Sequence, residues 1–222
     1  MMTLSSTSPL IIAVDGPAAS GKGTIARLLA RHFGLPHLDT GLLYRAVGLA
    51  VRDANLDPDD PEAAAQVAQA LSEDNLKDEA RLRGDEAGQM ASKVARHGPV
   101  RQALLQWQRD FAAQPGGAVL DGRDIGTVIC PQATVKLFIE AQPEVRAARR
   151  LQDLLSQGVD TDQQTVLADL RARDARDMAR ADAPLRMAAD AHLIDTTELD
   201  IDTAFDAARR CVELARSGAE AR

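Results

Sequence analysis

The feature that most constrains the fold is a stretch near the start of the chain in which a strand-forming run turns through two glycines and a lysine. Residues 10–14 are apolar and partly β-branched, and Gly16, Gly21 and Lys22 follow with the spacing G-x-x-x-x-G-K. An apolar stripe at helical spacing then runs from Ile25 to Phe33. A strand, a glycine-rich turn and a helix in this order are typical of a phosphate-binding loop (P-loop), in which backbone N–H groups and the helix N-terminus attract phosphate oxygens. An ordinary strand–turn–helix with a surface lysine is the alternative.

The residue after the lysine departs from the common form of this loop. That position usually carries a serine or threonine whose hydroxyl contacts Mg²⁺. Here it is Gly23, and the hydroxyl follows one position later, at Thr24. The order Gly-Lys-Gly-Thr resembles the loop of the nucleoside monophosphate kinases. It therefore favours a small-molecule kinase over a GTPase or a motor ATPase.

Length and composition exclude several other classes. The chain of 222 residues is long enough for one sizeable α/β core with inserted pieces, and its net charge of −7 offers no support for a nucleic-acid or anionic-membrane partner. Its two cysteines have no metal-ligand spacing, which favours a reducing cytoplasm. Residues 1–9 are rich in serine and threonine and lack a basic region, so we expect a frayed tail rather than a signal peptide or membrane anchor.

Five short apolar segments, separated by helical patterns, predict a parallel β-sheet covered on both faces. Ligands of such sheets bind at the carboxyl ends of the strands, and polar residues follow several of the predicted strands. The segments lie around residues 10–14, 36–39, 118–121, 135–140 and 191–195.

The interval of about 75 residues between the second and third predicted strands is too long for a simple crossover. Helical patterns over residues 41–54 and 99–111 predict an inserted substrate-binding subdomain at about residues 40–115. In the second of these helices Trp107 falls on the apolar stripe, so we expect it in the core rather than stacked on a ligand. The charged stretch 71–88 has no assignable pattern.

Two further helices, over residues 143–155 and from about residue 163 to 181, meet at a short turn and predict a mobile lid over about residues 156–185. Thr161 and Gln164 fit a capping box at the start of the second helix. The remaining core then comprises about residues 9–39, 116–155 and 186–217, all within a single domain. The last helix, over residues 201–215, has the pattern of amphipathic packing.

The second lid helix carries a charged stripe made of Arg173, Arg176, Asp177 and Arg180, which fall within about 100° of arc at 3.6 residues per turn. Three guanidiniums and a carboxylate can hold phosphates and a sugar hydroxyl. A solvated helix face with internal ion pairs is the alternative. The P-loop favours the first interpretation, since transfer of a phosphoryl group between two anions requires excess positive charge.

Two other loops follow predicted strands. The segment Asp121-Gly122-Arg123-Asp124 occupies the position where nucleotide enzymes often keep a carboxylate linked to Mg²⁺, although a plain glycine-rich loop is the alternative. No glutamate follows the first aspartate, and the guanine-reading pattern Asn-Lys-x-Asp is missing from the chain. After the second strand, Thr40 fits an N-cap, whereas Arg45 has no evident structural reason.

Taken together, the motifs resemble the bacterial cytidylate kinases, in the same order along residues 9–215. The matching motifs are Gly16-x-x-x-x-Gly21-Lys22-Gly23-Thr24, Asp39-Thr40-Gly41 with Tyr44-Arg45, Ala91-Ser92-Lys93-Val94-Ala95, Pro99-Val100-Arg101, Asp121-Gly122-Arg123-Asp124-Ile125-Gly126-Thr127, and Arg173-Asp174-Ala175-Arg176-Asp177 with Arg180.

This resemblance implies an α/β fold with a five-stranded P-loop core, an inserted nucleoside-monophosphate (NMP)-binding subdomain and a short helical lid. It implies the reaction MgATP + CMP ⇌ ADP + CDP, with dCMP also accepted. The implied partners are these nucleotides, with no nucleic acid and no membrane, and we expect a cytoplasmic monomer. ATP and Mg²⁺ are the implied cofactors, with no protein ligand assigned to the metal.

The site residues carry over by position. Lys22, Arg123 and Arg180 are expected to act in catalysis. The ATP contacts are expected at Gly16, Pro17, Ala18, Ala19, Ser20, Gly21, Lys22, Gly23, Thr24 and Arg149. Around the CMP phosphate we expect Thr40, Arg45, Arg123 and Arg180; facing the base, Ser92, Arg101 and Asp124; and near the phosphate and ribose, Arg173 and Asp177.

The chain departs from the family pattern in two places. The family position at Thr40 is commonly serine, which keeps the hydroxyl. Bacterial members usually carry a small antiparallel β insert before the Ala-Ser-Lys-Val-Ala helix, and residues 74–84 are too short for it. The sequence therefore does not determine the architecture of the insert.

The expected chemistry needs no strong general base, because the acceptor is an anionic phosphate oxygen. The four histidines lie outside the motifs and have adequate surface or packing explanations. Two other functions remain open: a kinase for UMP, AMP or a small alcohol such as shikimate, which the pair Arg101 and Asp124 disfavours, and a P-loop switch or binding module without a second substrate, which an arginine-rich lid disfavours.

Overall fold

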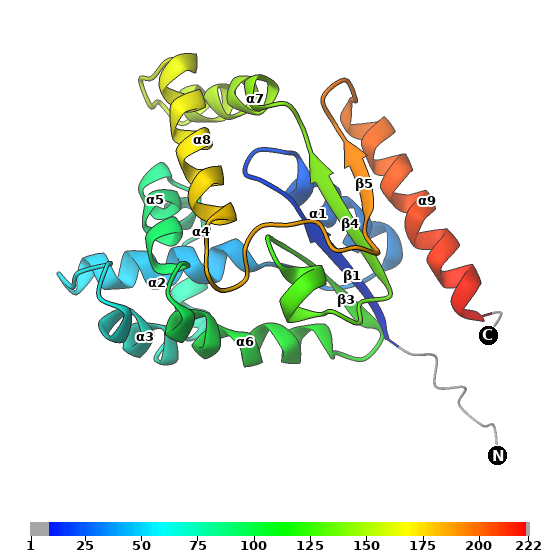
Figure 1. Ribbon diagram of the computed structural model, residues 1–222, viewed down its shortest axis with the longest axis horizontal. Helices are drawn as coiled ribbons and strands as arrows, with labels where there is room; N and C mark the ends of the chain where they lie inside the picture. Colours follow the sequence, from blue (N-terminus) through cyan, green and yellow to red (C-terminus); the bar gives the residue numbers. More distant parts are fainter. Residues whose placement is uncertain (1–8, 221–222) are drawn as a thin grey trace.

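The computed structural model describes residues 9–220, with side chains over residues 9–217, and shows a five-stranded parallel sheet with helices on both faces (Figure 1). The expected tail lies outside the described residues, apart from Pro9. The strand order is β2-β3-β1-β4-β5, and the strands are β1 (Leu10–Asp15), β2 (His37–Asp39), β3 (Gly117–Gly122), β4 (Val135–Glu140) and β5 (His192–Asp195). All five predicted strands are confirmed.

The central strand β1 is paired on both sides, with β3 and β4. Its apolar side chains alternate between two faces. Ile12 and Val14 pack with α1 (Lys22–Phe33) and α9 (Ile201–Glu220), whereas Ala13 packs with the end of α6 and the short π-helical segment η2 (Ile125–Ile129). This burial on both faces explains why the strand is a nearly continuous apolar run.

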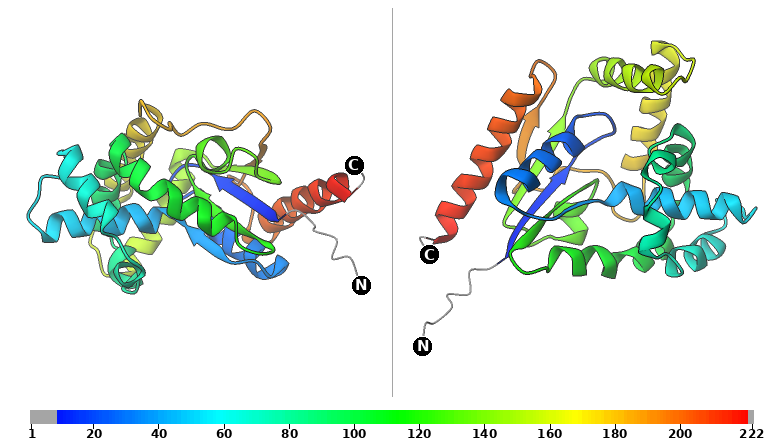
Figure 2. Two further views of the ribbon diagram at one scale, coloured as in Figure 1. Left: turned by 90° about the horizontal axis from the view of Figure 1, so that it is seen from below. Right: turned by 180° about the vertical axis from the view of Figure 1, so that it is seen from behind.

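All of the regular secondary structure between β2 and β3 is helical. Its elements are α2 (Thr40–Asp53), α3 (Pro61–Gln69), η1 (Glu73–Leu76), α4 (Glu79–Leu82), α5 (Asp85–Val94) and α6 (Gly98–Ala112). These helices lie together beside the sheet in Figures 1 and 2 and share a core of their own, against which Trp107 packs as predicted. The charged stretch 71–88 thus forms η1, α4 and the start of α5.

The N-cap of α2 differs from the prediction. The cap is Asp39, whose carboxylate accepts a hydrogen bond from the Gly41 backbone N–H at 3.0 Å. Thr40 is instead the first helical residue, and its hydroxyl donates to the Asp121 carbonyl oxygen at 2.9 Å. Thr40 therefore ties α2 to the end of β3, which gives it a structural role other than the expected cap.

After β4 the chain forms α7 (Pro143–Ser156) and α8 (Gln163–Met178), and Figure 2 shows both standing beyond the strand ends. The predicted capping box is wrong, because the N-cap of α8 is Asp162, which accepts from the backbone N–H groups of Gln164 and Thr165 at 2.8 and 3.0 Å. The helix also ends at Met178, short of the predicted end. Among the described helices, none combines the length and the apolar character needed to cross a membrane.

Candidate active site

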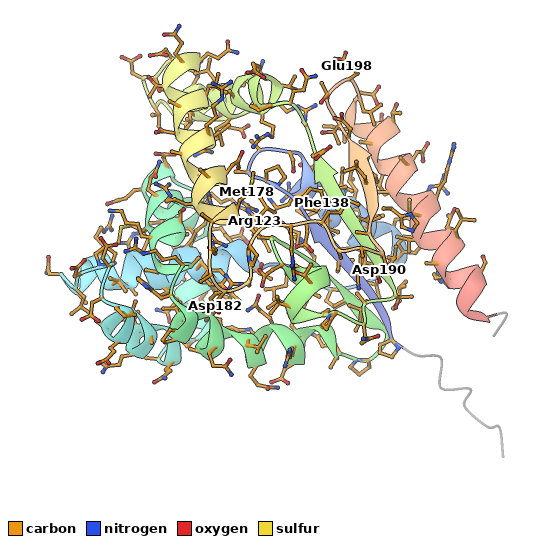
Figure 3. The ribbon with its side chains drawn as sticks, in the orientation of Figure 1. Arg123, Phe138, Met178, Asp182, Asp190 and Glu198 are labelled. Atoms are coloured by element: carbon orange, nitrogen blue, oxygen red, sulfur yellow. The ribbon has the colours of Figure 1, made fainter. Side chains whose placement is uncertain are left out.

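A cavity of about 980 Å³ opens at the carboxyl ends of the strands. It lies between the P-loop, the segment after β3, the outer part of α7 and the β5–α9 loop. Figure 3 labels Arg123 near the middle of this region, close to the end of α8. Lining residues include Ala18 through Thr24, Asp39, Arg45, Asp121, Arg123, Arg149, Arg173 and Thr196.

The P-loop has the backbone that its glycines permit. Gly16 has φ +151° and is packed so closely that a Cβ atom would clash with the Ile139 carbonyl oxygen. Gly21 has φ +88° and caps α1, whose first turn begins at Lys22 and faces the cavity. Gly16 and Pro17 are buried beneath the cavity, so of the expected phosphate contacts the cavity exposes Ala18 through Thr24.

Lys22 is held inside its own loop. Its ammonium donates to the Pro17 carbonyl oxygen at 3.2 Å. Burial and the neighbouring positive charge of Arg123 lower the pKa of Lys22 to about 7, against the opposing effect of Asp121 and Asp39. A phosphate group bound in the loop would place a negative charge next to the ammonium of this lysine.

Two carboxylates, Asp39 and Asp121, stand opposite each other at the ends of β2 and β3. Burial and the negative charge of Asp121 raise the pKa of Asp39. On the same side, His37 Nε2 lies 2.7 Å from Asp121 Oδ2. The contact of His37 was not predicted from the sequence, where only a surface or packing role was expected, although strand alternation puts His37 and Asp39 on one face of β2.

Two of the arginines expected at the acceptor phosphate, Arg123 and Arg180, converge around one carboxylate. Asp177 accepts from Arg123 Nε at 2.9 Å through Oδ2 and from Arg180 through Oδ1. Nearby, Arg173 Nε is buried with no hydrogen-bond partner within residues 9–217, and burial together with the charge of Arg123 lowers the pKa of Arg173 to about 9. This cluster has more positive than negative groups, and it fits an anionic ligand.

Arg45 has a packing role that could not be predicted from the sequence. Its guanidinium donates to the carbonyl oxygens of Leu82 and Gly84 at 2.8 and 3.0 Å, and so holds the junction of α4 and α5. The same side chain lines the cavity. Arg45 therefore combines a packing role with a position beside the arginine cluster.

The predicted stripe on α8 is only partly formed. Arg173, Arg176 and Asp177 lie on the helix, whereas Arg180 follows its end and reaches Asp177 from there. Arg176 is exposed, and its Nε donates to the Ser92 hydroxyl of α5 at 3.2 Å. Arg176 thus bridges α8 to the insert, while Arg173 and Arg180 belong to the buried cluster.

The three residues expected to face a base come from different elements of the same region. Arg101 of α6 and Asp124, just after β3, form an ion pair in which both side chains are less than a tenth exposed. The Arg101 guanidinium also lies 5.4 Å from the centre of the Tyr44 ring. Ser92, bound to Arg176, completes the set, and all three residues are buried. They lie beside the large cavity and do not line it.

Two arginines of α7 connect the P-loop to its surroundings. Arg149, an expected ATP contact, lines the cavity and donates to the hydroxyl and the carbonyl oxygen of Thr196 at 3.0 and 2.7 Å. Arg146 is buried and donates to the carbonyl oxygen of Ala18 at 3.1 Å and to the Asp174 carboxylate of α8 at 2.7 Å. No contact was predicted for Arg146 from the sequence.

The whole arrangement can bind two anionic groups side by side. The P-loop amides and Lys22 attract one of these groups. The arginine cluster (Arg123, Arg173 and Arg180) and the adjacent Arg45 attract the other. Because Lys22 and Arg123 are near enough for one charge to lower the pKa of the other, the two anion sites adjoin. Such a site suits transfer of a group between two phosphates.

Comparison with known proteins agrees with this geometry. The sequence model of the family described as Cytidylate kinase matches residues 12–214. A cytidylate kinase of Xanthobacter autotrophicus is 59% identical over 94% of this chain and all of the relative, and one of Caulobacter vibrioides is 57% identical over 93% of this chain and 97% of the relative. Among solved structures, an uncharacterized protein from Eubacterium ventriosum has a TM-score of 0.55 at 17% identity, covering 92% of this chain and 98% of that one, which supports the fold alone.

Proposed function

This chain belongs to the cytidylate kinase family and phosphorylates CMP, and we propose that it passes the γ-phosphoryl group of ATP directly to the CMP phosphate, with dCMP as a second acceptor. The observation that carries the proposal is the arginine cluster beside a P-loop, since an acceptor anion needs a cationic site adjoining the donor phosphates. We assign the insert at about residues 40–115 to NMP binding and residues 156–185 to a lid.

At the donor end, the ATP phosphates would lie against the cavity side of the loop, from Ala18 to Thr24, and the first turn of α1, with Arg149 at the cavity wall. Thr24, Asp39 and Asp121 supply oxygen donors on the same side of the cavity. The negative charge of Asp121 raises the pKa of Asp39, and two adjacent carboxylates fit a divalent cation. Mg²⁺ typically takes one or two carboxylates and completes its shell with phosphate oxygens and water. When bound, Mg²⁺ would neutralise charge developing on the transferring group.

At the acceptor end, the CMP phosphate is surrounded by Thr40, Arg45, Arg123 and Arg180. The phosphate and the ribose also lie near Arg173 and Asp177. The acceptor oxygen is already anionic, so the residues act by positioning and by neutralising charge rather than by removing a proton. Closure of the lid, residues 156–185, would exclude water as a competing acceptor.

The proposed function is tested by an assay that couples ADP release to an optical signal, run with CMP, dCMP, UMP, AMP and no acceptor. We expect fast turnover with CMP and dCMP and weak turnover with UMP and AMP. Equal rates with AMP or UMP would indicate a kinase for another monophosphate. ADP release that needs no acceptor would indicate a P-loop hydrolase or switch.

We expect replacement of Arg180 by alanine to weaken CMP binding and slow transfer, by about 10- to 100-fold in kcat/KM, since hydrogen bonds to charged groups contribute about 1.5–3 kcal/mol. Arg180 is 5% exposed in its side chain and is bound to Asp177 in the cluster. The matched control is Arg171→Ala, because Arg171 is 60% exposed and pairs with Glu144 on α7. Steady-state kinetics of both variants decide the point. Equal losses would mean that the cluster is only a charged surface.

We also expect ATP binding to take up a proton at pH 8. The pKa of Lys22 in the free protein is lowered to about 7 by burial, so this lysine is mostly neutral at pH 8 and mostly charged at pH 6. Bound phosphate raises its pKa, and proton uptake should therefore be close to one at pH 8 and small at pH 6. Titration calorimetry in two buffers of different ionisation enthalpy measures it. Lys22→Ala should abolish the uptake, and an unchanged value would assign the proton to another group.

A further inference from the structure

Asp15, the last residue of β1, spans the gap between the two substrate sites. Its carboxylate is buried, with only 5% of the residue exposed. Each oxygen accepts one backbone hydrogen bond: Oδ1 from the Ile125 N–H and Oδ2 from the Gly126 N–H, both at 2.8 Å. These amides come directly after Arg123 and Asp124, the two residues of this loop that the proposed function assigns to CMP.

We propose that Asp15 is a positioning residue that sets the CMP-binding loop at a defined distance from the P-loop. The main chain of Asp15 continues directly into Gly16, where the P-loop begins. Its side chain fixes the backbone that carries Arg123 and Asp124. One residue therefore fixes the donor loop through its main chain and the acceptor loop through its carboxylate. The inference rests on the proposed acceptor site.

The surrounding geometry leaves little room for another way to hold this loop. Gly126 packs so closely that a Cβ atom would lie 3.1 Å from Lys136 Cδ and 3.4 Å from Asp15 Oδ2. The Arg123 side chain forms an ion pair with Asp177 on α8, and the Asp124 side chain forms one with Arg101 on α6. Asp177 belongs to the proposed lid and Arg101 to the insert. Asp15 ties the loop to β1, the central strand of the sheet.

The bidentate contact requires an ionised carboxylate. A protonated acid would turn one acceptor oxygen into a donor that faces a backbone N–H, and one of the two hydrogen bonds would be lost. Burial raises the pKa of Asp15 to about 7, and the charge of Asp124 acts in the same direction, against the two backbone hydrogen bonds and Arg123.

Two other titratable groups face this carboxylate. Cys130, at the end of η2, has its own pKa raised to about 11 by burial, with the charge of Asp15 contributing. Lys136 of β4 packs its stem on Gly126 and directs its ammonium to Asp190 at 2.8 Å. Cys130 therefore keeps its proton between pH 5 and 9, and the loop contact should weaken only as Asp15 takes up its proton.

The test compares Asp15→Asn with Asp60→Asn in the full chain. Asp60 is an exposed N-cap that likewise accepts two backbone N–H bonds, from Glu62 and Ala63, and lies on the insert. We expect Asp15→Asn to lower kcat/KM for CMP by about 10- to 100-fold, since small misplacement of a reacting group has effects of this size. The KM for ATP should stay within about twofold, and Asp60→Asn should change neither constant.

The pH profile separates positioning from folding. In the wild type, kcat/KM for CMP should fall below about pH 7 through two protons, one on Asp15 and one on the CMP phosphate, whose own pKa is about 6. Asp15→Asn should keep only the phosphate step. In the wild type without ligand, the amide nitrogen and proton signals of Ile125 and Gly126 should titrate together near pH 7, a measurement that needs no variant.

The outcomes are distinct. An Asp15→Asn enzyme with normal CMP kinetics, or amide signals of Ile125 and Gly126 that stay fixed between pH 5 and 9, would overturn the inference. A loss of CMP and ATP use in equal measure, with a lowered melting temperature, would also overturn it and leave Asp15 as a packing residue. Failure of the wild type itself to phosphorylate CMP would overturn the proposed function instead.

Discussion

Replacement of Lys22 by alanine is expected to lower kcat by about a thousandfold while changing CMP affinity by less than about threefold, in line with the loss of one preorganised charge from a phosphoryl-transfer site. The ammonium rests on the Pro17 carbonyl oxygen at 3.2 Å within the loop, and the cavity opens in front of it. When ATP fills the loop, this charge acts on the transferring phosphate. A group that acts mainly in the transition state changes kcat more than substrate binding.

Lys77→Ala is the matched control, since its side chain is 77% exposed and pairs with Asp74, three residues before it. Both proteins are assayed at saturating ATP and CMP, and CMP binding is measured separately by titration. Retention of most of the wild-type rate by Lys22→Ala would refute the assignment of this loop to ATP. An equal loss in CMP affinity would mean that Lys22 serves the acceptor site instead.

The sheet was predictable because every strand leaves a local signal. Buried parallel strands are short, nearly continuous apolar runs, and the five predicted segments agree with the observed strands to within one residue at nearly every end. The P-loop was equally clear, because Gly16 and Gly21 are required by their backbone conformation and packing. Features that depend on a few adjacent residues can be read from those residues.

The errors at the helix caps have a common cause. In both cases an aspartate stands next to the predicted threonine, and the two side chains offer similar acceptors to the same backbone amides. The cap of α2 is Asp39 because the Thr40 hydroxyl is drawn to the Asp121 carbonyl oxygen, 81 residues further along the chain. When a tertiary contact determines which residue caps a helix, the neighbouring sequence carries no pattern that predicts it.

The members of the candidate site were predictable as motifs, whereas their contacts were not. Arg101 and Asp124 come from separate motifs, and nothing local indicates that they pair with each other. The same holds for Arg123 with Asp177. No functional contact was predicted for His37 or Asp15, because the partner of each lies on another strand or loop. The stretch 71–88 was not assigned because its helical pieces η1 and α4 are four residues each, too short to show a period.

The preference for cytosine is expected to be large, with kcat/KM for CMP at least about a hundredfold above that for UMP, a difference on the order of 3 kcal/mol. Cytosine carries a 4-amino donor beside two acceptors, N3 and O2. Asp124 Oδ2 accepts from Arg101, and none of the hydrogen bonds within residues 9–217 uses Oδ1. We expect Oδ1 to accept from the 4-amino group, while Arg101 and Ser92 donate to the acceptors.

Uracil reverses this pattern, because it presents a carbonyl and an N–H where cytosine has the amino group and N3. The carboxylate of Asp124 would then face another acceptor in a pocket where its side chain is 7% exposed. Buried polar groups left without partners are strongly unfavourable, so the mismatched base should be rejected. Asp124→Asn should erode the preference mainly through loss of CMP, since an amide can turn its NH₂ group toward a carbonyl.

The variant also breaks the ion pair with Arg101, so its effect on folding needs a control. Asp59→Asn removes the carboxylate of a surface ion pair, with Arg96 at 2.7 Å, and should leave both kcat/KM values unchanged. Melting temperatures of the three proteins are compared first, and kcat/KM is then measured for CMP and UMP in each. A general loss of stability lowers both constants together, whereas a lost base contact lowers the CMP value alone. Use of UMP as well as CMP by the wild type, or a ratio that Asp124→Asn leaves intact, would show that Asp124 does not read the base.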